Sequence, residues 1–336
     1  SGNQIDIEPQ DLDCNSIVHE LTNSDFEHGT YRIRRCGTYK LTEDIVLNMN
    51  APSEAEMEMD AFSPNDVIKY YWYPTWQQQA DENEYPSKNL VGPYSLGFFA
   101  GISVEAQDVV IDLNGYEMKM DDAFYLQQRF FSLIELASKP FIDGQGPSNW
   151  GTNNEQFASN VVIKNGVLSL TSHSCIHGNN NENVVIQDIK CRDFEVSGIT
   201  MNGFHGLTIE NVEVGPNNQN IPLMPNYAFA RAMLSRLELI DDKVNKFVFI
   251  GNVRYTADEI INSLQHEMDQ AFAYSYNQDT ELVDQDEIDR NIFINKDGLP
   301  RGGTLYGIFL NSIGFSSFGL GLSPGYSTDL VLKNIK

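Results

Sequence analysis

The feature of this 336-residue sequence that most constrains its fold is a short segment that recurs at intervals of 23 residues. The copies begin at Asn160, Asn183 and Gly206, and each runs through three aliphatic or β-branched residues to an Asn or Asp. A second segment keeps the same interval, because Cys175–Asn179 is followed 23 residues later by Gly198–Asn202. More distant copies of the two patterns are Asp108–Leu113, Asp329–Asn334 and Gly307–Asn311. Short β-branched runs bounded by Gly and Asn are typical of strands separated by turns. Repeats of this length predict an all-β solenoid, a right-handed parallel β-helix with helical insertions.

A polar residue ends each copy of the first segment. On successive coils these residues fall on the same turn, where a polar side chain can stack on its copy and bond to turn amides. We therefore interpret Asp188 as a member of this ladder and not as a catalytic acid, because catalytic carboxylates are scarce. The ladder residues are Asn165, Asp188, Asn211 and Asn334.

Composition excludes some partners. The chain has 22 Lys and Arg against 47 Asp and Glu, a formal net charge of −25. Nucleic acid is an unexpected partner, because neutralising phosphates needs clustered cations. No stretch approaches the roughly 18 apolar residues that cross a bilayer, so we expect no membrane insertion. With 41% hydrophobic residues, the chain can bury a sizeable core.

The four cysteines, at positions 14, 36, 175 and 191, fit neither a disulfide-dense scaffold nor a CxxC metal site. Their positions leave a disulfide between Cys14 and Cys36 as the pairing that we expect.

Three insertions break the repeat, over residues 51–95, 121–138 and 225–303, and each precedes a strand of the Gly-Ile type. Apolar spacing predicts helices over 121–137, 228–239 and 257–272, and a strand over 246–250. Insertions of this length are usually functional, and here they would crowd one face of the solenoid. The domain division is 1–50 (N-terminal cap and first strands), 51–97 (insertion loop), 98–224 (β-helix coils), 225–303 (mainly helical insertion) and 304–336 (further coil).

Several fuller motifs resemble the pectin-lyase-like β-helix superfamily, and their wording is similar to that of uncharacterised β-helix proteins of giant DNA viruses and algae. These motifs are Gly29–Ile33, Gly37–Ile45, Ile111–Gly115 and Arg129–Ala137. The resemblance implies a fold more than a chemistry, because the superfamily includes lyases, glycoside hydrolases, epimerases, phage tailspikes and adhesins. The aspartate cluster of polygalacturonase-like hydrolases is missing from the equivalent strands of this sequence.

Candidate site residues lie on the Gly-Ile strands. Side chains alternate along a strand, so the residue after each inward Ile points outward. This alternation predicts an outward column of Ser103, Asp143, His177, Thr200 and Phe309. We predict Asp143 and His177 as an acid/base pair, because a carboxylate beside an imidazole can exchange protons with a sugar. The predicted substrate-binding residues are His173, Asn179, Thr200, Asn202 and His205. Partly exposed turn residues are the alternative for the histidines. Their spacing lacks a zinc signature, so we predict no metal site.

Two functions are compatible with these features. The first is a carbohydrate-binding or carbohydrate-processing β-helix of the polysaccharide lyase, epimerase or glycoside hydrolase type. Its partner would be a neutral or weakly acidic glycan or polysaccharide, because the acidic surface repels polyuronates unless calcium bridges them. Calcium therefore stays open as a cofactor, with acidic runs over 54–60 and 279–289. The second is a non-catalytic structural or adhesive virion or fibre protein, with a homotrimer as an open alternative. Either function implies an extracellular or virion-associated location.

Overall fold

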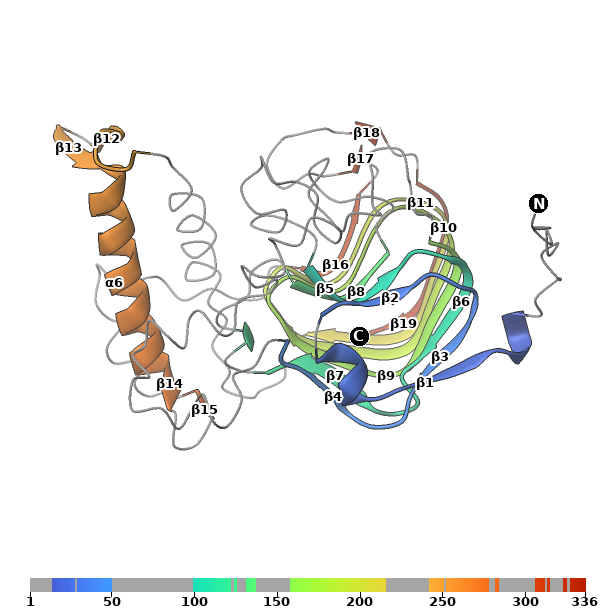
Figure 1. The fold of residues 1–336 in the computed structure, drawn as a ribbon. Coiled ribbons are helices and arrows are strands. Elements are labelled where there is room, and N and C mark those ends of the chain that lie inside the picture. Colours follow the sequence, from blue (N-terminus) through green and yellow to red (C-terminus); the bar gives the residue numbers. More distant parts are fainter. Residues whose placement is uncertain are drawn as a thin grey trace, which may run out of the picture.

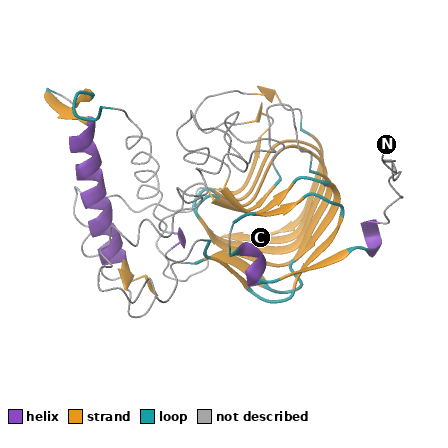
Figure 2. Cartoon of the chain, viewed as in Figure 1, coloured by secondary structure: helices purple, strands orange, loops and turns teal. Residues whose placement is uncertain are grey.

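The computed structural model describes residues 14–27, 29–49, 99–121, 124–125, 131–136, 158–215, 242–250, 252–277, 282–283, 306–311, 313–314, 323–324 and 327–336. Over these residues the protein is mostly β-structure. Thirteen strands join in one large sheet that curls into a half-barrel (Figure 1, Figure 2). They are β1 (Val18–Leu21), β2 (Tyr31–Ile33), β3 (Gly37–Leu41), β4 (Ile45–Leu47), β5 (Phe99–Val104), β6 (Gln107–Asp112), β7 (Glu117–Met120), β8 (Phe131–Glu135), β9 (Ser159–Thr171), β10 (Ser174–Phe194), β11 (Ser197–Gly215), β16 (Tyr306–Asn311) and β19 (Thr328–Ile335).

The pairings within this sheet are parallel, and the 23-residue interval of the sequence sets part of their register. Ile163, Ile186 and Ile209 lie side by side on β9, β10 and β11, each 23 residues after the last. The long strand β10 pairs with β11 over most of its length, and on its other edge it meets β8 first and β9 later. One continuous segment thus bends round the sheet, which is compatible with a β-helix or solenoid.

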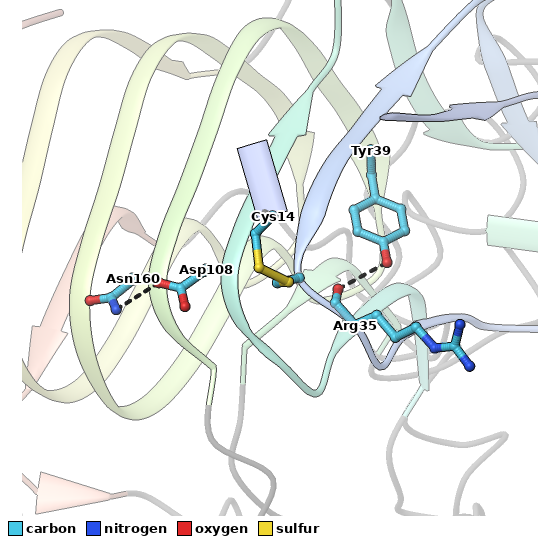
Figure 3. The surroundings of a disulfide bond; sticks show 6 residues. Cys14, Arg35, Tyr39, Asp108 and Asn160 are labelled. Atoms are coloured by element: carbon cyan, nitrogen blue, oxygen red, sulfur yellow. Dashed lines mark hydrogen bonds between the residues drawn. A yellow bond between two sulfur atoms is a disulfide. The ribbon is translucent and has the colours of Figure 1, made fainter. Parts of the chain in front are cut away.

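The polar ladder is confirmed at the turn that follows the first segment. Asn211 Nδ2 donates to Asp188 Oδ1 at 3.0 Å, and Asn334 Nδ2 donates to Asn211 Oδ1 at 2.9 Å. All three residues have φ between 52° and 55°, the left-handed region that Asn and Asp tolerate better than other side chains. A second ladder begins the segment, where Asn160 donates to Asp108 at 2.9 Å (Figure 3).

The core consists of the apolar side chains that alternate inward along the strands. Fully buried examples are Ile111, Ile163, Ile186 and Ile209, which share one column. Each coil thus stacks an aliphatic side chain on that of the next, and this burial is the main stabilising term.

The N-terminal strands carry a disulfide between Cys14 and Cys36, as predicted (Figure 3). It ties η1 (Cys14–Ser16) to the segment that enters β3, and the two Cα atoms lie 5.3 Å apart. The other short helix, η2 (Asn23–Phe26), lies on β4, where Asn23 Oδ1 accepts from the Val46 backbone N–H at 2.8 Å.

The third insertion contains a hairpin and a helix. Strands β12 (Phe247–Ile250) and β13 (Val253–Thr256) pair antiparallel and lead into α6 (Ala257–Ser275). This confirms the strand predicted over 246–250 and the helix predicted over 257–272. Residues 228–239 lie outside the described residues. The remaining short strands are β14 (Tyr276–Asn277), β15 (Leu282–Val283), β17 (Ile313–Gly314) and β18 (Ser323–Pro324).

The helix predicted over 121–137 is wrong for its last part, because residues 131–135 form strand β8. The spacing of Phe131, Ile134 and Ala137 imitates a helical stripe. However, all five residues of β8 are buried, so its sequence lacks the alternation of polar and apolar residues that distinguishes a strand.

Candidate functional site

The Gly-Ile strands line up in the order β2, β5, β8, β10, β11 and β16. Ile102, Ile134, Ile176 and Ile199 occupy one inward row, so the next residue of each strand points to the outer face. We call this outer row the polar row. Its members are Arg32, Ser103, Glu135, His177, Thr200 and Phe309.

The polar row corrects the predicted partner of His177. The step beside Ile176-His177 is Ile134-Glu135 on β8, and not the expected Ile142-Asp143. The error follows from taking residues 131–135 as helix, which shifted the expected strand to 140–142. Asp143 itself lies outside the described residues.

Glu135 and His177 form the centre of the row. His177 Nδ1 lies 2.6 Å from Glu135 Oε1, and the two side chains are 2% and 3% exposed. On the other side of the ring, Asn202 Nδ2 lies 3.2 Å from His177 Nε2. An amide nitrogen can only donate, so in this arrangement Nε2 accepts and Nδ1 carries the proton that bonds to Glu135. The carboxylate therefore fixes the tautomer and orientation of the imidazole.

Asparagines continue the site along the next outward row. Asn179, Asn202 and Asn311 pair in register across β10, β11 and β16, and Asn202 Nδ2 donates to Asn179 Oδ1 at 2.9 Å. Asn202 is buried, and its Oδ1 accepts no hydrogen bond within the described part of the chain. A buried acceptor without a donor is uncommon in proteins. This oxygen belongs to the amide whose nitrogen contacts His177, so the site has an unused acceptor next to its imidazole.

Hydroxyl groups and a second histidine surround this centre. Ser132 Oγ and His173 Nδ1 lie 3.3 Å apart, and the rings of His173 and His177 have centroids 5.6 Å apart. Thr200 is buried and hydrogen-bonds to Ser197. The structure thus brings His173, Asn179, Thr200 and Asn202 around His177, as the sequence predicts.

His205 does not belong to this cluster by register. It pairs with Glu182 on one side and Thr328 on the other, and its Nδ1 lies 3.1 Å from Thr328 Oγ1. The side chain is exposed, in contrast to the buried His177. Its position after a left-handed turn places it on another row, a change of direction that a count along the sequence misses.

An ion pair that the sequence reasoning missed lies at the N-terminal end of the row. Arg32 bonds through Nε and Nη2 to the two carboxylate oxygens of Glu105, whose side chain is 2% exposed. Ser103 Oγ donates to the same carboxylate at 3.1 Å, and Arg34 Nε lies 3.6 Å away with its side chain 52% exposed. Arg32 stands in Gly29–Ile33, so that motif marked the fold without revealing this pairing.

The described residues contain no group of three or more His, Cys, Asp or Glu arranged to hold a metal ion. The acidic run over 54–60 lies outside the described residues, as does that over 279–289 except for Leu282 and Val283. No helix in the described part of the chain is long and apolar enough to span a membrane. Comparisons with protein-family models, curated proteins and solved structures found no match to this chain. The resemblance to pectin-lyase-like proteins therefore rests on the sequence motifs.

Proposed function

We propose that the curled sheet is a right-handed parallel β-helix and that its polar row binds or processes a carbohydrate. The fold proposal is supported by the 23-residue register of β9, β10 and β11 and by the two polar ladders at their turns. The functional proposal is supported by one arrangement, the carboxylate-oriented imidazole of His177 beside the unused acceptor of Asn202.

The chemistry of the proposed site follows from its donors and acceptors. A sugar hydroxyl can donate to Asn202 Oδ1, while the amide of Asn179 and the hydroxyl of Thr200 orient neighbouring hydroxyl groups. When the sugar takes the place of the Asn202 amide nitrogen, His177 Nε2 becomes free to accept a proton. Glu135 holds the opposite side of the ring and stabilises the imidazolium that forms. Glu135 and His177 thus replace Asp143 and His177 as the proposed acid/base pair.

The reaction class follows from which proton His177 takes. At a uronate, transfer of the C5 proton to Nε2 leaves an enolate-like charge that an amide such as Asn202 can stabilise, as in elimination or epimerisation. In a glycoside hydrolysis the protonated ring would instead deliver a proton to the leaving oxygen. The net charge of −25 favours a neutral or weakly acidic glycan, because a polyuronate would be repelled.

The proposed location is extracellular or virion-associated. The Cys14–Cys36 disulfide supports it, because disulfides persist mainly in oxidising compartments and on virion surfaces.

Incubation with defined oligosaccharides, followed by mass spectrometry, tests binding and turnover together. Wild-type protein should retain or convert at least one neutral or weakly acidic glycan. Asn179→Ala should weaken retention, because Asn179 is only half-buried and reaches the row from the accessible side. Gln187→Ala, on another face of the same strand, is the matched control and should behave as wild type. His177→Ala should lower any turnover by about a hundredfold or more.

A non-catalytic structural or adhesive virion or fibre protein is the second candidate. It is favoured by the burial of Glu135, His177 and Asn202, since catalysis needs access to the imidazole. In that case the polar row holds neighbouring coils together, no glycan is converted, and His177→Ala changes only the free energy of unfolding.

A further inference from the structure

The two ends of the curled sheet differ in how well they cover the core. At the N-terminal end, Leu21 and Phe26 are 0% and 2% exposed, and η2 bonds along β4. At the C-terminal end, β19 pairs with β11 and with no other strand of the described chain. Its outer edge therefore presents unpaired backbone groups.

The side chains of β19 show that the core is open at this end. Leu330 and Leu332 are 44% and 50% exposed, and they stand in register with Leu207 and Ile209, which are fully buried. Residues that close the core in one coil are thus half exposed in the last one.

We propose that this open end binds the same end of a second copy of the chain, through antiparallel pairing of β19 with its counterpart about a two-fold axis at Val331. An axis perpendicular to the sheet keeps the inward faces of both strands on the same side. The two sheets then continue into one another, and the two open cores close against each other. This inference does not depend on the proposed function.

The sequence of β19 is self-complementary about that axis. Antiparallel pairing centred on Val331 sets Leu330 opposite Leu332 of the second copy, so that two inward aliphatic residues meet. One step further out, Asp329 faces Lys333, an opposite-charge pair that occurs twice by symmetry. An interface between identical patches requires this kind of self-matching, and a partner of unrelated sequence would not.

Charge also favours this end as the place where two copies meet. The protein has a net charge of −25, so most of its surface repels a second copy. Residues 327–336 contain one acidic residue, Asp329, against Lys333 and Lys336. The side chain of Lys333 is 59% exposed beside Glu210, which leaves it accessible to the Asp329 of a second copy.

The mass in solution tests the proposal directly. Multi-angle light scattering on the full chain at micromolar concentration should give twice the mass of one chain. Leu332→Lys should give a single chain, because it places a charge in the shared core while altering a side chain that is half exposed in the free monomer. The matched control is Val18→Lys, a 58% exposed residue of the same sheet at its opposite end, which should leave the dimer intact.

Cross-linking tests the axis. Val331→Cys should form a disulfide or short bis-maleimide cross-link between two copies, since residue 331 faces itself across a two-fold axis. Val18→Cys should not. Asp329→Lys and Lys333→Glu should each weaken the dimer by setting like charges opposite, and mixing the two variants should restore it. A monomeric or trimeric wild type, a cross-link at residue 18, or no rescue on mixing would overturn the proposal.

Discussion

His177 and Glu135 lie 42 residues apart in the sequence, yet their side chains meet on neighbouring parallel strands with Nδ1 2.6 Å from Oε1. Both are almost completely buried, although they occupy the outer face of their strands. The pair therefore combines two demands, since it orients a side chain that could exchange a proton and keeps a carboxylate out of water.

The first prediction concerns this pair. His177→Ala should lower the free energy of unfolding by about 3 kcal/mol, because it removes a hydrogen-bond partner from a buried carboxylate. Denaturant titration would measure the change. Gln187→Ala on the same strand should stay within about 0.5 kcal/mol of wild type. In a double-mutant cycle with Glu135→Gln, the two effects should fail to add by about 1 to 3 kcal/mol. Additive effects would mean that the two side chains are not energetically coupled.

The second prediction separates two arginines that approach one carboxylate. Arg32→Ala should destabilise the protein by about 3 kcal/mol, because it leaves the buried Glu105 without its bidentate partner. Arg34→Ala should cost less than about 1 kcal/mol, since this side chain is half exposed and its Nε lies 3.6 Å away. Urea unfolding of both variants would compare them. Equal losses would show that exposure does not determine the contribution of each arginine.

The third prediction concerns the polar ladder. Asn211 has φ of 55° and both donates to Asp188 and accepts from Asn334. Asn211→Ala should cost about 2 kcal/mol, because it loses the ladder bonds and also strains the left-handed backbone. Asn211→Gly should cost about 1 kcal/mol less, because glycine adopts this conformation freely. Thermal unfolding of the two variants gives the difference, and identical midpoints would contradict the role assigned to the backbone.

The fourth prediction concerns pH. Burial raises the pKa of the Cys175 thiol well above its ordinary value of 9.0, and the hydrogen bond with Cys191 raises it further. Because the folded-state pKa is raised, the stabilisation is complete below about pH 9 and is lost as the pH rises further. The free energy of unfolding should therefore fall between pH 8.5 and 10, and Cys175→Ala should flatten that fall.

Thiol titration gives an independent check on the same residue. At neutral pH Cys175 should react with a thiol reagent only after denaturation, because the neutral buried thiol is a poor nucleophile. Rapid reaction in the native protein would contradict the burial.

The sequence by itself determined the repeat and its local chemistry. Asn165, Asp188 and Asn211 are predictable as turn residues because their 23-residue spacing and their tolerance of left-handed backbone are both local properties. The helix α6 is predictable for the same reason. Thr256 and Glu259 form a capping box before an amphipathic run, and the backbone N–H of Thr256 donates to Glu259 Oε2 at 2.8 Å.

Only the tertiary structure decided which residues share the polar row. Ile176 pairs with Ile199 after 23 residues, but with Ile134 across 42 and, through Ile199, with Ile308 after a further 109. Insertions of unequal length separate these strands, and loop length has only a weak effect on the free energy of closing a coil. The sequence therefore carries no count that identifies Glu135 as the neighbour of His177. Burial likewise depends on packing against distant segments, so the outward direction of His177 was readable from the alternation along its strand, whereas its loss of contact with water was not.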